Sequence, residues 1–510
     1  MGQSANDGDP VKPDRCRIDN SIPMRQVFQS QPFRLFRFFT IRSLSMTTHS
    51  RSEFDSTANF QRLAQAVSRN LLMILIIPMM MIISLVTGSG CHRAVRTASY
   101  SIPDPVLNQM VVRELNLPAD SVTSRHLGRL PMIRQDKIGL DSAHKVLTIA
   151  GLEYAQNLKI LKLPFNHIRD LSPIAPLTEL EILHLSTNDI IDLSPLHNMN
   201  KLVVLDLSSN LVKDPTPLNG MDKLRDLNLA HNDVVDVSQF TSLKHLITLN
   251  LELNRINPDY AFASLSALKS LDLSMNRLKR LPNMRRLKKL ASLSVNANDL
   301  KDLDDLKTIR NLESLCGYNN RIVDISGLAH LTEMENLFLF QNDISDLSPL
   351  NSLVKLNRLD LSRNRITDLT VLRNLTSLKW INLSHNSLTD IRPLAGLINL
   401  EYLNLSDNPI DIESVREVLS RMEKLTELNL SNCSLSKLDM LSNCRHLKRL
   451  HLNYNQLEDQ ELLSLKSLTQ LQYLSLHGNP KITSEGIAAF RHSFEGNDSS
   501  LMIAPVLKRP

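Results

Sequence analysis

The side chains of this 510-residue chain that are best suited to chemistry are aromatic and basic residues between positions 316 and 402. Several stand 22 residues apart, as Arg358, Trp380 and Tyr402 do, and Trp380 is the only tryptophan. Trp, Tyr and Arg contribute most of the binding energy when a partner buries them. We therefore predict a partner-binding patch, with Cys316 beside it, made of Tyr318, Phe338, Phe340, Arg358, Arg363, Trp380, His385 and Tyr402.

A column of nine aspartates recurs at a similar interval and could be taken for a carboxylate array that binds cations. Each Asp precedes a turn-forming stretch, often Leu-Ser-Pro, and an Asp side chain readily accepts a hydrogen bond from the backbone N–H two residues on. We therefore expect turn capping, and no metal site, from Asp170, Asp192, Asp214, Asp236, Asp302, Asp324, Asp346, Asp368 and Asp390.

Catalytic signatures are missing from the sequence. It contains no Gly-rich phosphate loop, no His-Glu-x-x-His and no nucleophile elbow, and its histidines occur singly. The five cysteines show neither pairing nor zinc-ligand spacing. The formal charge of +5 is interpreted as spread along the chain, which predicts no nucleic-acid partner. We expect neither an enzyme nor a cofactor.

A repeat of 22 residues positions these side chains. It runs in some fifteen copies from Leu158 to about Asn479 in the frame L-x-x-L-x-L-x-x-N-x-I-x-D-L-S-P-L. The leucines of L-x-x-L-x-L alternate with period two, so each copy predicts a short strand with one dry and one wet face. The Asn can satisfy buried backbone groups where the chain turns. Cys433 replaces it in one copy and is expected to be a buried structural thiol.

This frame is the leucine-rich repeat signature, and the chain resembles that family over 158–479. The resemblance implies an α/β solenoid, a horseshoe of about 15 coils with a parallel concave sheet. Proline in the second half of each copy predicts a convex side that is mostly loop or 3₁₀ turn. The third, fifth, seventh and eighth positions should face away from the core, and the predicted patch falls on them.

The segment before the repeats resembles the N-terminal cap of bacterial internalin-like leucine-rich repeat proteins. An apolar helical stripe begins at Val106, and the stretch 113–123, RELNLPADSVT, matches the helix and turn of that cap. We expect a cap and a degenerate first coil over 105–157. Two coils near the other end depart from the period, because 412–422 and 460–468 predict outer helices there.

The C-terminal end should be closed by a helix within 480–495, capped by Thr483 or Ser484. The last residues, 496–510, have no pattern and are predicted to form a tail.

The N-terminal region predicts export. Residues 1–70 have no period, which indicates disorder or a start codon assigned too far upstream. Then come sixteen uncharged residues and Thr87-Gly88-Ser89-Gly90-Cys91, so that 71–91 resembles a bacterial lipoprotein signal with Cys91 as the lipidated residue. Gly88 departs from that pattern, where an aliphatic residue is usual. An uncleaved membrane anchor, an ordinary cleaved signal and a cytoplasmic protein are the alternatives, and 92–104 would be a tether.

The sequence thus predicts a non-enzymatic, monomeric binding module in the cell envelope, membrane-anchored or secreted. Its concave face would recognise a protein or peptide, with a second, smaller patch at Arg449, His451, Tyr454 and Tyr473. Two alternatives remain, namely an intracellular regulatory subunit or scaffold of the phosphatase-regulator kind and a glycan-binding adhesion protein. The mature N-terminus distinguishes the intracellular scaffold from an exported protein, because a chain that begins at Cys91 would exclude the scaffold.

Overall fold

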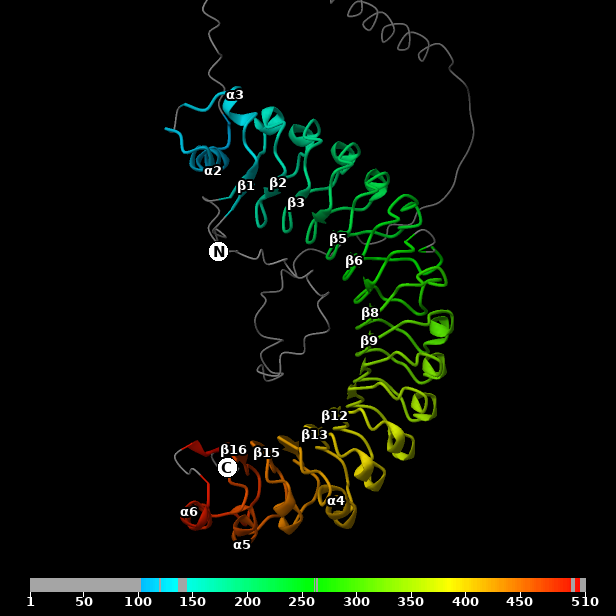
Figure 1. The fold of residues 1–510 in the computed structure, drawn as a ribbon, viewed down its shortest axis with the longest axis vertical. Coiled ribbons are helices and arrows are strands. Elements are labelled where there is room, and N and C mark those ends of the chain that lie inside the picture. Colours follow the sequence, from blue (N-terminus) through cyan, green and yellow to red (C-terminus); the bar gives the residue numbers. More distant parts are fainter. Residues whose placement is uncertain are drawn as a thin grey trace, which may run out of the picture. The chain divides into compact units, whose positions relative to one another are not determined.

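The computed structural model describes residues 102–118, 121–135, 145–260, 262, 265–496 and 500–504, all within one compact unit. A single parallel sheet of 17 strands runs through this unit. Its strands line the inner side of a curved array, and short helices and turns line the outer side (Figure 1). The predicted leucine-rich repeat solenoid is confirmed.

Each strand is three residues long and pairs with the next strand along the chain. The strands are β1 (Met132–Arg134), β2 (Ile160–Lys162), β3 (Ile182–His184), β4 (Val204–Asp206), β5 (Asp226–Asn228), β6 (Thr248–Asn250), β7 (Ser270–Asp272), β8 (Ser292–Ser294), β9 (Ser314–Cys316), β10 (Asn336–Phe338), β11 (Arg358–Asp360), β12 (Trp380–Asn382), β13 (Tyr402–Asn404), β14 (Glu427–Asn429), β15 (Arg449–His451), β16 (Tyr473–Ser475) and β17 (Met502–Ala504).

The helical segments are mostly single 3₁₀ turns on the outer side. The α-helices are α2 (Pro105–Leu115), α3 (Ser124–Leu127), α4 (Ile412–Leu419), α5 (Asp459–Leu462) and α6 (Ser484–Ser493). The 3₁₀ helices are η3 (Leu152–Tyr154), η4 (Ser172–Ile174), η5 (Ser194–Leu196), η6 (Thr216–Leu218), η7 (Asp304–Thr308), η8 (Ser326–Leu328), η9 (Ser348–Leu350), η10 (Thr370–Asn374), η11 (Arg392–Gly396), η12 (Asp439–Asn443) and η13 (Leu463–Leu465).

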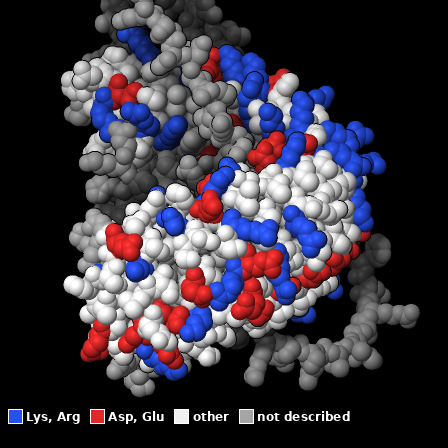
Figure 2. All heavy atoms as spheres, turned by 60° about the horizontal axis from the view of Figure 1, so that its bottom comes forward, with Lys and Arg blue, Asp and Glu red and all other residues white. Residues whose placement is uncertain are grey.

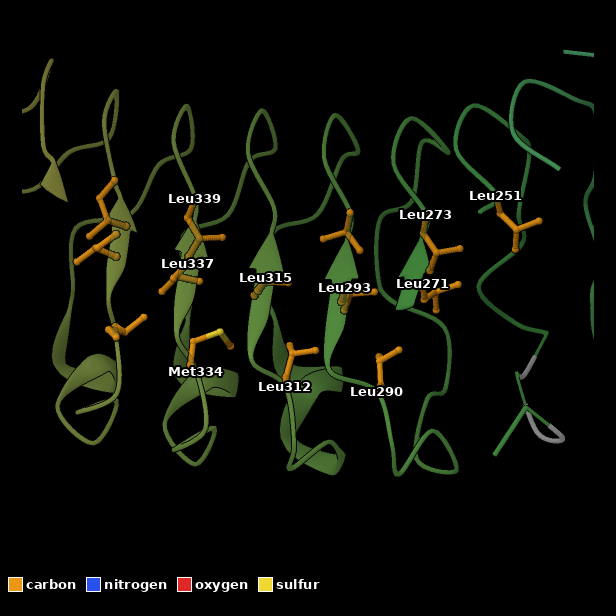
Figure 3. Close-up of a cluster of buried hydrophobic side chains, with 14 of the residues drawn as sticks. Leu251, Leu271, Leu273, Leu290, Leu293, Leu312, Leu315, Met334, Leu337 and Leu339 are labelled. Atoms are coloured by element: carbon orange, nitrogen blue, oxygen red, sulfur yellow. The ribbon is translucent and has the colours of Figure 1, made fainter. Parts of the chain in front are cut away.

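The core is a set of leucine columns that run from coil to coil. Leu293, Leu315 and Leu337 occupy the middle of successive strands and are fully buried (Figure 3). Because the side-chain period of a strand is two, the residues on either side of each such leucine face away from this core. No coil could bury its leucines alone, so the stability comes from stacked neighbours.

The asparagine column joins each coil to the preceding one. The Nδ2 of Asn364 donates to the carbonyl oxygens of Leu361 and Leu339, both at 3.0 Å, and its Oδ1 accepts from the N–H of Ile344 at 3.0 Å. Cys433 occupies the same place, where its thiol donates to the carbonyl of Leu405 at 3.3 Å. Burial raises the pKa of Cys433 to about 12. Both structural roles predicted from the sequence are confirmed.

The residue before each member of this column has a left-handed backbone. Its φ lies between 50° and 61° in fourteen non-glycine residues, among them Arg363 and His385 of the predicted patch. The later copy ending at Asn479 has Gly478 there, with φ 74°. This conformation turns the chain from the strand toward the interior, where the asparagine is needed. It therefore also fixes the direction of the two patch side chains.

The aspartate column caps turns, as predicted. In all nine cases one carboxylate oxygen accepts a hydrogen bond from the N–H two residues on, at 2.7–3.3 Å. Hydrogen bonding to Ser194 accordingly lowers the pKa of Asp192. Within the described ranges, no group of three or more His, Cys, Asp or Glu residues is placed to hold a metal ion.

The N-terminal end of the array has two helices, α2 and α3, within the expected cap. Asp104 caps α2, because its Oδ1 accepts from the N–H groups of Val106 and Leu107. Its Oδ2 accepts from the N–H of Leu147 at 2.8 Å, which ties the helix to the degenerate first coil. The apolar residues Val146, Ile149 and Leu152 of that coil are fully buried. An extra strand, β1, joins this end to β2 and was not predicted.

The C-terminal end differs from the expected tail. Thr483 caps α6 as predicted, with its Oγ1 accepting from the N–H of Gly486 at 3.0 Å. Beyond the helix, however, β17 pairs in parallel with β16, so the sheet continues to Ala504. Leu501 is buried beside it, which gives this segment the apolar contact that a tail would lack. The outer helices α4 and α5 are shorter than the predicted 412–422 and 460–468.

The predictions for 1–70, 71–91 with Cys91, and most of the 92–104 tether lie outside the described residues. None of the helices in the described ranges combines the length and the apolar character needed to cross a bilayer.

Candidate partner-binding surface

Three strands place the centre of the predicted patch. Arg358, Trp380 and Tyr402 begin β11, β12 and β13, and they are direct partners in the register of the sheet. The next residues in each strand, Leu359, Ile381 and Leu403, are fully buried in the core. The three patch side chains therefore share the opposite, inner face, at the roughly 4.8 Å spacing of neighbouring strands.

The aromatic residues form two stacks. The Trp380 and Tyr402 rings are nearly parallel, with centroids 4.7 Å apart, and Phe338 is tilted against Trp380 at 6.4 Å. Tyr318 and Phe340 form the other stack, at 4.3 Å and 8°. Burial, followed by the nearby Glu427, raises the pKa of Tyr402, so this phenol stays neutral at physiological pH.

Exposure within the patch differs from what the repeat positions suggested. Arg358, Arg363 and His385 are exposed, and the side chains of Tyr318, Phe340, Trp380 and Tyr402 are half-buried. Phe338, however, is only 2% exposed, and the neighbouring Cys316 only 1%. Neither belongs to the continuous core that Leu337 and Leu339 join. Phe338 lies on the inner face with its ring tilted against that of Trp380 and is buried there, so the expectation of its exposure is wrong.

A polar edge borders the aromatic stacks at the left-handed positions of three coils. An Arg363 guanidinium nitrogen lies 3.3 Å from Nε2 of His385, and that Nε2 lies 3.2 Å from an Asp407 carboxylate oxygen. Partial burial and Arg363 together lower the pKa of His385, although Asp407 opposes them. His385 is therefore largely neutral at pH 7, and the edge exposes one arginine beside one carboxylate.

The sequence did not point to Asp360, a buried carboxylate in the middle of the patch. Its Oδ1 accepts from the N–H and Oγ of Ser362, at 3.0 and 2.7 Å, and its Oδ2 accepts from Nδ2 of Asn382 at 3.2 Å. Burial nevertheless raises the pKa of Asp360. The signal that could have found it is the recurring Asp/Asn-Leu-Ser at the end of the strands, as at Asn382–Ser384.

Two buried polar atoms near the stacks have no hydrogen-bond partner among the described residues. They are Nε1 of Trp380 and Oγ of Ser314. An orphan buried polar group costs roughly 1–3 kcal/mol. The inner face thus offers flat aromatic surface, and the N–H of Trp380 is buried without an acceptor among the described residues.

The second predicted patch is largely satisfied by its own contacts. The Arg449 guanidinium lies 5.0 Å from the Tyr473 ring centroid and its Nε is 3.3 Å from Glu427. His451 packs on the same ring at 5.1 Å and also approaches Glu427. Burial would raise the pKa of Glu427, but hydrogen bonding to His451 and the charge of Arg449 outweigh it and lower the pKa. This group has less unused binding capacity than the Trp380 stack.

The arrangement suits binding and contains no reactive constellation that we can identify among the described residues. The nearest candidate is the His385–Asp407 pair, but the hydroxyl of the adjacent Ser384 donates to Oδ1 of Asn382. The described thiols of Cys433 and Cys444 are buried in the core, and burial raises the pKa of each to about 12. Their side chains are therefore inert.

Comparisons with known proteins agree with the leucine-rich repeat fold. A family described as leucine-rich repeats (2 copies) matches residues 332–374, 376–417 and 445–488, and a single leucine-rich repeat matches 424–444. No curated protein sequence matches the chain. Repeats and sheet together define a leucine-rich repeat solenoid.

Three solved structures illustrate the likeness. A leucine-rich repeat protein of Leptospira interrogans is similar at 26% identity and a TM-score of 0.65, covering 72% of this chain and 96% of its own. An internalin of Listeria monocytogenes, inlF, is 26% identical over 80% of this chain and 96% of its own, with a TM-score of 0.46. The Arabidopsis receptor kinase HAESA was solved with the peptide hormone IDA and the co-receptor SERK1. It is similar at 19% identity and a TM-score of 0.52, covering 76% of this chain and 72% of its own.

Proposed function

We propose that this protein is a non-enzymatic binding module that recognises a protein or peptide through the inner face of its sheet. The observation that supports this most directly is the Trp380–Tyr402 stack, an aromatic surface of two half-buried rings beside the exposed Arg358. Aromatic and arginine side chains of this kind are typical hot spots of interfaces.

The fold supports this proposal in a general way. HAESA, which shares the fold, was solved with a peptide hormone, so a peptide ligand is compatible with an array of this type. Solenoids present long surfaces on which side chains vary without disturbing the core. In this chain the aromatic side chains of the inner face concentrate in the coils of β9–β13, whereas the strands β5–β8 contain no aromatic residue.

Selection from a random peptide library tests the proposal directly. The library is selected on the full-length protein, and the affinities of the enriched peptides are measured by calorimetry for wild type and Trp380→Ala. We expect a loss of about 2 kcal/mol or more, as for an interface hot spot. Acceptance of sugars but not peptides by the same stack would favour the glycan-binding alternative.

The matched control for this test is Tyr473→Ala. It also removes a half-buried aromatic side chain from the inner face, but from the second predicted patch, where Tyr473 of β16 packs against Arg449 and His451. The peptides should bind Tyr473→Ala as they bind wild type. Equal losses in the two variants, or no loss in Trp380→Ala, would refute the assignment of the site.

We further propose that the protein is exported and attached to the cell envelope through a lipid on Cys91. The support is the sequence of 71–91 alone, an uncharged apolar run followed by small residues and a cysteine. The test is the intact mass of the protein recovered from membranes of its native host. A chain beginning at modified Cys91 is the expected result, whereas a soluble chain with Met1 intact would favour the intracellular scaffold.

A further inference from the structure

One coil of the array, residues 268–289, holds an unusual concentration of positive charge. It contains eight of the basic residues, namely Lys269, Arg277, Lys279, Arg280, Arg285, Arg286, Lys288 and Lys289. The preceding coil, 246–267, contains one, and the following coil, 290–311, contains three. The only carboxylate within 268–289 is Asp272. The prediction that the positive charge is spread along the chain is therefore wrong for this coil.

All eight basic side chains of this coil, called here the basic coil, are exposed. They alternate with Leu278, Leu281, Met284 and Leu287, which are at most 1% exposed and form part of the core. Lys269 precedes β7 and the other seven lie between β7 and β8, so they follow the turn and the outer side of the coil. In Figure 2, Lys and Arg gather along the right-hand side of the surface, which is the convex side of the array in Figure 1.

Most of these charges are not neutralised within the described chain. Arg280 pairs with Asp259 of the preceding coil, and no ion pair joins the other seven to a described carboxylate. In two other coils, the arginine at the position of Arg277 is paired with an aspartate of the preceding coil. There Arg255 pairs with Asp233 at 2.9 Å, and Arg321 pairs with Asp299 at 3.4 Å. Arg277 has Arg255 rather than an aspartate at the same position of the coil before it.

The width of the basic coil limits what it could bind. It is a single coil, and the strands of neighbouring coils are only about 4.8 Å apart. Carboxylates lie on both sides of it, with Asp259 in the preceding coil and Asp299, Asp302, Asp304 and Asp305 in the following one. A duplex or a lipid bilayer would cover several coils and meet these acids. A single linear polyanion that crosses the array along one coil would not.

The composition of the basic coil distinguishes between the two remaining classes of linear polyanion, namely single-stranded nucleic acids and acidic polysaccharides. Residues 268–289 include no Phe, Tyr or Trp, and single-stranded nucleic acids are held largely by stacking of bases on such side chains. Arg277, Arg285 and Arg286 have no ion pair with a described carboxylate, and each can form two parallel hydrogen bonds to a sulfate or carboxylate group. We propose that the basic coil is a second binding site, separate from the inner face, for a linear acidic polysaccharide that bears sulfate or uronate groups.

The test uses the full-length protein and a heparin octasaccharide as the probe. Binding is measured by calorimetry at several salt concentrations for wild type and for a variant with Arg285, Arg286, Lys288 and Lys289 all replaced by Gln. These side chains are exposed and without ion pairs in the described chain, so the fold should be retained. We expect the variant to bind about tenfold more weakly or worse, with a salt dependence lower by about 3 logarithmic units per decade.

The matched control replaces four exposed basic residues of other coils by Gln, namely Lys213, Lys223, Arg373 and Arg421. Both variants lower the formal charge from +5 to +1, because four positive charges are removed from each. The control should keep wild-type affinity within about twofold, and Trp380→Ala should also bind the probe normally. Equal losses in the two fourfold variants would overturn the proposal, because net charge alone would then explain binding.

Two further probes identify the class of ligand. A single-stranded DNA of matched charge and vesicles of phosphatidylcholine with phosphatidylserine are measured against wild type at 0.15 M salt. We expect both to bind at least tenfold more weakly than the octasaccharide. Equal or stronger binding of either probe at the basic coil, or no binding of the octasaccharide, would refute a polysaccharide site.

Discussion

Removal of one ladder asparagine, Asn342→Ala, should destabilise the array by an amount that its contacts define. The Nδ2 of Asn342 donates to the carbonyls of Gly317 and Leu339, and its Oδ1 accepts from the N–H of Ile322, all at 3.0 Å. The substitution affects these three backbone groups unequally. Both carbonyls keep another asparagine donor, from Asn320 and Asn364 respectively.

The N–H of Ile322 has no second acceptor among the described residues, and it lies in a coil whose Ile322 side chain is fully buried. An orphan buried N–H costs roughly 1–3 kcal/mol, and each of the two lost carbonyl bonds costs about 0.5–1.5 kcal/mol. Partial relaxation reduces the sum, so we expect a loss of about 2–4 kcal/mol in the free energy of unfolding.

Urea unfolding followed by far-UV circular dichroism measures this loss as a shift of the midpoint at constant slope. The control is Ser345→Ala in the same coil, because Ser345 is exposed. It should change the free energy of unfolding by less than about 0.5 kcal/mol. A loss below about 1 kcal/mol in Asn342→Ala, close to that of the control, would refute the view that the asparagine column satisfies groups that water cannot reach.

The remaining predictions concern the inner face. Phe338→Ala should cost about 2–4 kcal/mol in urea unfolding because the ring is 2% exposed; a smaller loss than that of the half-buried Phe340→Ala would contradict this burial. Burial raises the pKa of Asp360, so the folded state favours the neutral carboxyl group. The contribution of this neutral carboxyl group to the stability of the fold is therefore lost as pH rises through the raised pKa. The melting temperature of Asp360→Asn, which cannot ionise there, should therefore fall less from pH 4 to pH 7 than that of wild type, and an identical pH dependence in the two proteins would count against the assignment.

The regular part of the fold is predictable because each position of the repeat has one local task. Period-two leucines indicate the strands, the asparagine matches the inward turn, and aspartates such as Asp192 bond the N–H two residues on. These tasks depend on neighbours within the coil or one coil away. The strand β17 could not be predicted in this way, because it has no repeat of its own and exists only through pairing with β16.

The candidate site is only partly predictable for a different reason. The repeat positions indicate which side of the sheet a residue occupies, but not how deeply it is buried on that side. Phe338 is therefore on the expected face and yet buried. The basic coil is hard to detect because its cations are interrupted by core leucines in the sequence, whereas one turn of the solenoid brings their exposed side chains onto the surface of a single coil.

The asparagine ladder also has a mechanical consequence. Each ladder side chain bonds only its own coil and the one before it, as Asn364 does with Leu361 and Leu339. A pulling force applied to the two ends of the array would therefore not load all coils in parallel, and the coil with the weakest interface would detach first. Each detached coil would release about 75 Å of extended chain, so the array would behave as an extensible spring that lengthens in discrete steps.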